Sequence, residues 1–172
     1  MECTKIILAS YKNFDAYIEE LDKRIENICV YSHRSNLDCE SIAESVFKIS
    51  ARKEKVLDLK QKVDKVFSLL SDEERDLIRL KYFDEHIDRT FDYSLRTYFR
   101  KQLRLFEKLD LYFSYIGISD ESFFEKFKGD KFFVSAKIKA DDVKRIACHF
   151  NDYAKKKKDR KKQSVENAVK IA

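Results

Sequence analysis

The sequence contains no proline and only two glycines among its 172 residues. Soluble proteins contain on average roughly 5% proline and 7% glycine, and β-sandwiches, propellers and glycine-rich nucleotide-binding folds need such residues at every turn. Their scarcity argues against these folds. No apolar run approaches the ~18 residues of a membrane span, and the run at positions 6–9 is too short for a signal-peptide core. We therefore expect a cytoplasmic protein.

Apolar residues make up 44% of the chain and charged residues 39%, with 14 phenylalanines and 9 tyrosines. This apolar and aromatic share is too high for a disordered polyelectrolyte, so we predict a globular, all-α protein. The net charge of +5 is local, because the run KKKKDRKK at positions 155–162 alone contributes +6. The rest of the chain is nearly neutral.

Catalytic and metal-binding patterns are not evident in the sequence. It contains no phosphate-binding glycine loop, nucleophile elbow or His-Glu-x-x-His pair. The cysteines are expected to be reduced thiols, and no spacing of cysteine and histidine matches a zinc module. The residues concerned are Cys3, Cys29, His33, Cys39, Cys148 and His149. We expect neither an enzyme nor a metal or other cofactor.

Two stretches show heptad spacing of apolar residues, joined by a polar connector at positions 31–38. The first comprises Ile7, Tyr11, Phe14, Ile18, Leu21, Ile25 and Ile28; the second comprises Ile42, Val46, Ile49, Val56, Val63, Phe67 and Leu70. They predict two helices paired as an antiparallel hairpin over residues 4–70. Lys53 and Lys60 occupy two core positions of the second helix, where we expect them to reach water and fix the register.

A second predicted part, residues 71–116, has the layout of a helix-turn-helix. Ser71 and Glu74 form a capping box that begins one helix, and Ser94 can cap a second helix that runs to about Tyr115 and ends at Gly117. Residues 84–92 between them are expected to form a turn or one short helix.

The second helix of this layout is basic on one side. At 100° per residue, its bases fall within an arc of about 140°; they are Arg96, Arg100, Lys101, Arg104 and Lys108. The apolar residues predicted to cover the buried side are Tyr98, Phe99, Leu103, Leu105, Phe106 and Leu109. In a helix-turn-helix, the first residues of the second helix contact base edges and later bases contact phosphates.

The stretches LSDEERDLIRLKYF and YSLRTYFRKQLRLFEKL, between positions 70 and 109, resemble region 4 of bacterial sigma factors. The likeness is closer to the phage late-gene and autolysin regulators of Firmicutes and their prophages. It implies duplex DNA as a partner, and RNA polymerase as a further one. It implies that the recognition helix begins with Arg96, Thr97 and Tyr98 and that Arg100, Lys101 and Arg104 flank the DNA backbone. Together with the cap residue Ser94 and the basic Lys108, these are the predicted DNA-binding residues.

The third predicted part, residues 117–172, resembles no family known to us. A short helix is expected over residues 120–128, with Phe123, Phe124 and Phe127 inward and Gly129 at its end. Residues 131–139 alternate as in a strand or extended segment, and Asp141 is predicted to cap a final helix that frays into a basic tail. The tail cations are Lys155, Lys156, Lys157, Lys158, Arg160, Lys161 and Lys162.

Three functional hypotheses follow. The first is a DNA-binding transcriptional regulator of the phage type, with the hairpin as a spacer, a homodimer surface or a contact for RNA polymerase. The second is a helical protein-interaction module that has lost DNA binding; it is motivated by the shortness of the 84–92 segment and the nearly neutral body. The third is non-specific nucleic-acid binding through the lysine tail, which would weaken steeply with salt.

Overall fold

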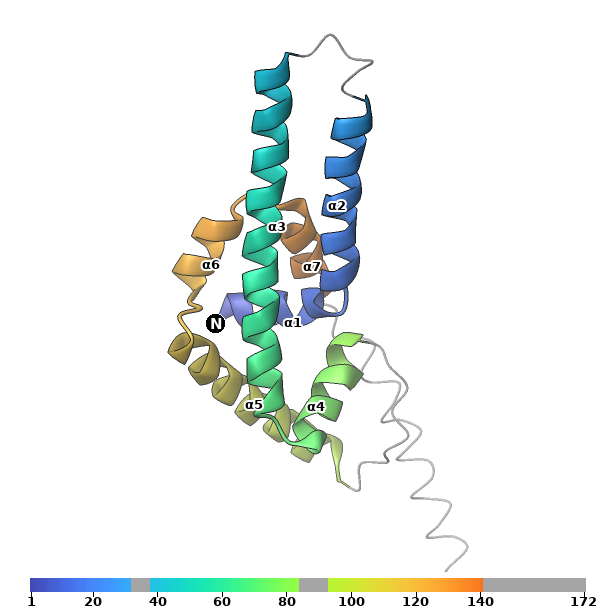
Figure 1. Ribbon diagram of the computed structural model, residues 1–172. Helices are drawn as coiled ribbons and strands as arrows, with labels where there is room; N and C mark the ends of the chain where they lie inside the picture. The colour runs from blue at the N-terminus through green and yellow to red at the C-terminus, as the bar shows by residue number, and fades with distance from the viewer. Residues whose placement is uncertain (32–37, 84–92, 141–172) are drawn as a thin grey trace, which may run out of the picture.

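The computed structural model describes residues 1–31, 38–83 and 93–140, and within them the chain is helical and contains no strand (Figure 1). The all-α prediction is confirmed for this part of the chain. The elements are α1 (Glu2–Tyr11), α2 (Phe14–Tyr31), α3 (Cys39–Ser68), α4 (Asp72–Ile78), the π-helical turn η2 (Arg79–Phe83), α5 (Leu95–Tyr115), α6 (Asp120–Phe127) and α7 (Lys131–Ala140). The expectations for the 84–92 segment, the helix after Asp141 and the lysine tail lie outside the described residues.

Helices α2 and α3 pack side by side and run in opposite directions (Figure 1). The Asp38 carboxylate begins α3 by accepting a hydrogen bond from the backbone N–H of Ser41 (2.6 Å). The two lysines predicted at core positions reach acids of the facing helix: Lys53 binds Asp22, and Lys60 binds Asp15. These ion pairs link the two helices in one register.

The single first helix predicted from the heptad spacing is wrong, because the chain turns at residues 12–13. The N–H of Asn13 donates to the carbonyl of Ser10 (2.9 Å), and the carbonyl of Asn13 accepts the first hydrogen bond of α2. Helix α1 therefore lies across the base of the hairpin (Figure 1). It is buried on almost every side, as expected of a helix that is enclosed by others; its buried residues are Cys3, Thr4, Ile6, Ile7, Leu8 and Ser10.

The core lies where the other helices surround the inner half of the hairpin. Val56, Val63 and Val66 of α3 are buried there, together with residues of α1, α4, α5, α6 and α7. In the outer half of the hairpin the apolar residues of the seam are only half-buried: Ile25, Ile28, Ile42, Val46 and Ile49. One buried cluster thus contains residues from all three predicted parts of the chain, whose division at residues 70 and 116 stays a prediction.

The strand or extended segment expected over residues 131–139 is also wrong, because this stretch is helix α7. The carboxylate of Asp130 accepts a hydrogen bond from the N–H of Phe132 (3.0 Å) at its start. Phe133 and Ala136, one turn apart, are buried, whereas Val134 is exposed. In α6, Phe123 and Phe127 are buried as predicted, but Phe124 is exposed, because the helical period turns it away from them.

The carboxylate of Asp130 is only 2% exposed and joins three helices. It accepts hydrogen bonds from the Tyr17 hydroxyl of α2 (3.0 Å) and the Arg52 Nε of α3 (2.8 Å). The Tyr17 ring stacks on Phe132 of α7 at 4.1 Å, and burial together with the neighbouring Asp130 raises the pKa of Tyr17 to about 12. A buried carboxylate is tolerated only with such partners.

We expect the Asp130→Ala variant to lose about 3 kcal/mol of unfolding free energy, because removing the carboxylate leaves the Tyr17 hydroxyl and the Arg52 guanidinium without their acceptor. Urea unfolding followed by circular dichroism measures this loss. The control is Glu125→Ala, which removes an exposed acid of α6 and should change stability by less than about 0.5 kcal/mol. Equal unfolding midpoints for the two variants would contradict this assignment.

Candidate nucleic-acid interface

Helix α5 begins as the sequence predicts. The Ser94 hydroxyl accepts a hydrogen bond from the N–H of Thr97 (3.3 Å) and lies 3.1 Å from the Thr97 hydroxyl. Both predicted DNA-contacting hydroxyls therefore take part in the helix cap. The cap sets the direction of the first turn, from which Arg96 extends.

Three of the five bases of α5 face solvent. Arg96, Arg100 and Arg104 are exposed and follow one another at intervals of one helical turn. At 1.5 Å per residue they extend over about 12 Å of the helix. Within the described ranges no acidic side chain forms an ion pair with any of the three. Their guanidinium groups are thus available for an anionic ligand.

The other two bases, Lys101 and Lys108, bind acids at the beginning of α4. Lys101 pairs with Glu73, and the Lys108 Nζ lies 2.8 and 2.9 Å from the two carboxylate oxygens of Glu74. The hydrogen bond with Glu74 raises the pKa of Lys108. Burial acts to raise the pKa of Glu74, but its bonds with Lys108 and Ser71 outweigh burial and lower it. These two lysines hold α4 against α5.

The predicted contact of Tyr98 with DNA is wrong, because its side chain is completely buried. Burial raises the pKa of this tyrosine to about 12. Beside it, the buried amide of Gln102 donates to the carbonyl of Leu77 in α4 (3.0 Å) and to the Tyr98 hydroxyl (3.1 Å). Both residues therefore belong to the α4–α5 contact.

The predicted apolar face of α5 is correct only in part. Leu105 and Leu109 are buried with Tyr98, and Phe106 is half-buried, whereas Phe99 and Leu103 are 48% and 61% exposed. The buried row also includes the polar Gln102. Because hydropathy assigns a polar residue to the surface, it predicted a buried face that lies too far toward Phe99 and Leu103. The exposed face of α5 consequently combines three arginines with two apolar side chains.

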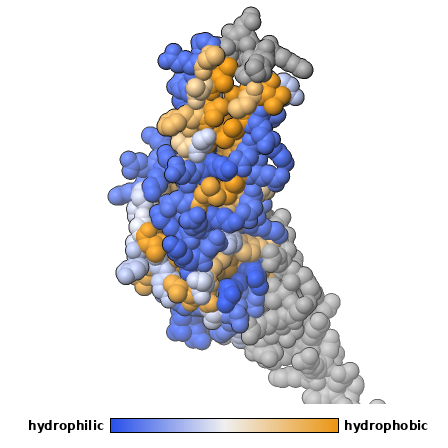
Figure 2. All heavy atoms as spheres, viewed as in Figure 1, coloured by the Kyte–Doolittle hydropathy of each residue, from blue (hydrophilic) through white to orange (hydrophobic). Residues whose placement is uncertain are grey.

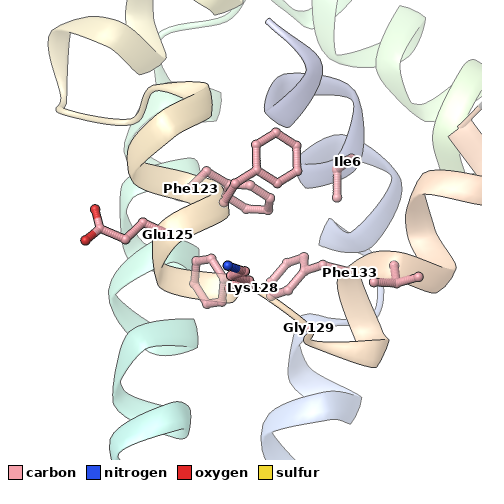
Figure 3. A pocket seen from close by; sticks show the side chains of 9 residues that line it. Ile6, Phe123, Glu125, Lys128, Gly129 and Phe133 are labelled. Carbon is pink, nitrogen blue, oxygen red and sulfur yellow. The ribbon is translucent and has the colours of Figure 1, made fainter.

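A pocket of about 550 Å³ lies between α1, α6 and α7. Figure 3 shows the rings of Phe123 and Phe133 directed into this pocket, with Ile6 opposite and Glu125 pointing away from it. Its walls are almost entirely apolar, and no motif in the sequence predicts it. Without a convergent set of polar groups, the pocket offers no catalytic arrangement.

The cysteines and histidines considered as metal ligands in the sequence are not gathered into a site in the described part of the chain. Cys3 is buried and Cys29 and Cys39 are exposed, and no three potential metal ligands lie together among the described residues. The pair Cys148–His149, His33 and the tail cations lie outside that part. No helix described by the structure combines the length and the apolar character that crossing a membrane requires.

Comparison with known proteins gives no relative: no family model matches this chain, and neither does any curated protein or solved structure. The likeness to sigma region 4 therefore rests on the sequence motifs at positions 70–83 and 93–109 alone.

Proposed function

We propose that this protein is a non-enzymatic DNA-binding regulator that contacts duplex DNA through the exposed face of α5. The observation that carries the proposal is the row formed by Arg96, Arg100 and Arg104, exposed and without acidic partners among the described residues. Planar guanidinium groups form paired hydrogen bonds with phosphate oxygens, so a row of arginines suits a nucleic-acid backbone better than scattered lysines do. The resemblance to phage regulators supports the same function.

The three arginines have different tasks in this proposal. Arg96 lies in the first turn of α5, the part of a recognition helix that reaches base edges. Arg100 and Arg104 bind phosphates farther along the helix and set its orientation. Lys101 and Lys108 lie at the edge of the same face, where their ion pairs with Glu73 and Glu74 of α4 withhold them from DNA.

Replacing all three arginines by glutamate should abolish binding to duplex DNA and leave the helical content unchanged, since the side chains are exposed. Replacing them by alanine should reduce the slope of log affinity against log salt by about 2–3, because each phosphate contact contributes ~0.9. Fluorescence anisotropy with a random-sequence duplex at several salt concentrations measures both effects.

The matched control carries the same charge change on other exposed lysines of the body, Lys5→Glu, Lys65→Glu and Lys131→Glu. It should bind DNA within a few-fold of the unchanged protein. If the arginine and control variants lose affinity equally, the general charge of the protein binds DNA and the α5 face does not.

The pairing of α4 with α5 predicts a variant with increased affinity. Glu73→Gln with Glu74→Gln releases Lys101 and Lys108 from their ion pairs, while glutamine retains the capping interaction with Ser71. The two freed cations should steepen the salt dependence of DNA binding by up to about 2. Unchanged affinity and slope in the same anisotropy titration would show that these lysines do not lie close enough to the DNA.

A second candidate function is self-association through the outer half of the hairpin. Figure 2 shows apolar residues gathered at this end of the molecule, and Val30, Tyr31 and Phe47 are exposed there. The half-buried seam of α2 and α3 would be covered if two hairpins packed as a four-helix bundle. A dimer would also place two α5 faces on one DNA molecule.

Sedimentation velocity tests this candidate. The unchanged protein should form a dimer at micromolar concentration, and Val30→Lys with Phe47→Lys should give a monomer, because two exposed apolar contacts are replaced by repelling charges. A monomer at all concentrations before any substitution would contradict self-association and leave the proposal for α5 unaffected.

A further inference from the structure

A second basic surface lies between α3 and α6, formed by residues that do not belong to the α5 face. Two hollows of about 320 and 40 Å³ lie along α3 and share Lys55, Lys126 and Phe127 as lining residues. The two hollows are adjacent, because they share these residues, and we call them together the α3–α6 groove. Its two walls are far apart along the chain, so no local sequence pattern predicts it.

Six cations line this groove: Lys48, Arg52, Lys55, Lys62, Lys126 and Lys128. Those of α3 are separated by four, three and seven residues, a spacing that places them on one face of the helix. At 1.5 Å per residue they form a stripe of about 21 Å. Lys126 and Lys128 face it from the end of α6.

Two acidic residues line the groove, and both already pair with cations of the protein. Asp58 pairs with Lys62 within α3 (2.8 Å), and Asp130 binds Arg52 and Tyr17. Lys55, Lys126 and Lys128 are exposed and have no acidic partner among the described residues. Like charges collected in a concave surface attract an anionic occupant and are neutralised by it.

The floor of the groove is apolar, formed by buried side chains such as Leu59, Phe123 and Phe127. A single-stranded nucleic acid binds by stacking its bases on exposed ring faces, but these two rings are buried and only Phe47, at the outer end, is exposed among the aromatic residues of the lining. A duplex presents charged phosphates to a basic surface and has no apolar group to place on this floor. A peptide can supply both, because its carboxylates pair with cations while a bulky apolar side chain lies in the hollow of about 320 Å³.

We propose that the α3–α6 groove binds an acidic peptide segment of a partner protein. Its carboxylates pair with Lys55, Lys126 and Lys128, and one apolar side chain lies in the hollow beside Phe127. This site goes beyond the proposed DNA binding and does not depend on it, because none of the three exposed arginines of α5 lines the groove. The protein would then bind DNA on one surface and an acidic protein on another.

The test uses the full chain and a fluorescein-labelled peptide of three Glu-Glu-Phe repeats, which in extended form covers the ~21 Å stripe at ~3.3 Å per residue. Anisotropy should show saturable binding, weakened at least tenfold by Lys55→Glu with Lys126→Glu. The charge-matched control Lys5→Glu with Lys65→Glu should bind within twofold of the unchanged protein. A Gln-Gln-Phe peptide should not bind, and circular dichroism verifies that every variant is folded.

Absence of binding, or equal weakening in the groove and control variants, overturns the proposal. Tighter binding of single-stranded oligo(dT), lost in the groove variant, would assign the groove to nucleic acid and also overturns it. The Arg96→Glu, Arg100→Glu, Arg104→Glu variant separates the two proposals. It should lose duplex DNA and retain the acidic peptide, so failure of one activity is distinguishable from failure of the other.

Discussion

The buried carboxylate of Asp130 is the interaction on which the arrangement of the C-terminal helices depends. It binds both arms of the hairpin, through Tyr17 and Arg52, at the residue where α7 begins. Helix α7 packs along α1, and the N–H of Cys3 at the start of α1 donates to the Asp120 carboxylate of α6 (2.8 Å). Burial acts to raise the pKa of Asp120, but its hydrogen bonds with Cys3 and with the N–H of Glu2 outweigh burial and lower it. Asp130 thus fixes α7 against the hairpin, and Asp120 fixes α6 against α1.

On α5, the lysines bind acids within the protein, whereas the arginines are exposed to solvent. A lysine ammonium is a compact charge on a flexible chain, and Lys101 and Lys108 use it to pair with single acids of α4. The arginines occupy the positions that α4 does not cover, where a planar group with several donors can bind an external anion. Helix α5 therefore uses two of its cations to hold α4 and presents the other three to solvent.

Local patterns in the sequence predicted where several helices begin, but they did not predict how the helices pack against one another. The caps at Ser71 and Ser94 are short-range hydrogen bonds, so the starts of α4 and α5 could be found from neighbouring residues. The turn at Asn13 could not, because the heptad spacing continues across it and only packing of α1 against α7 reveals the break. Burial of Tyr98 but exposure of Phe99 likewise depends on where α4 lies, and the α3–α6 groove depends on Asp130 drawing distant segments together.

The length of α3 explains why one chain can carry several surfaces. Its 30 residues extend about 45 Å, yet only the inner half, from Val56 onward, is buried in the core. The apolar seam of the outer half stays half-buried. The cations Lys48, Arg52 and Lys55 lie where the outer half meets the body, beside α6. Because α3 extends beyond the buried core, it carries both the half-buried apolar seam of the outer hairpin and one wall of the α3–α6 groove. Both surfaces lie apart from the arginines of α5.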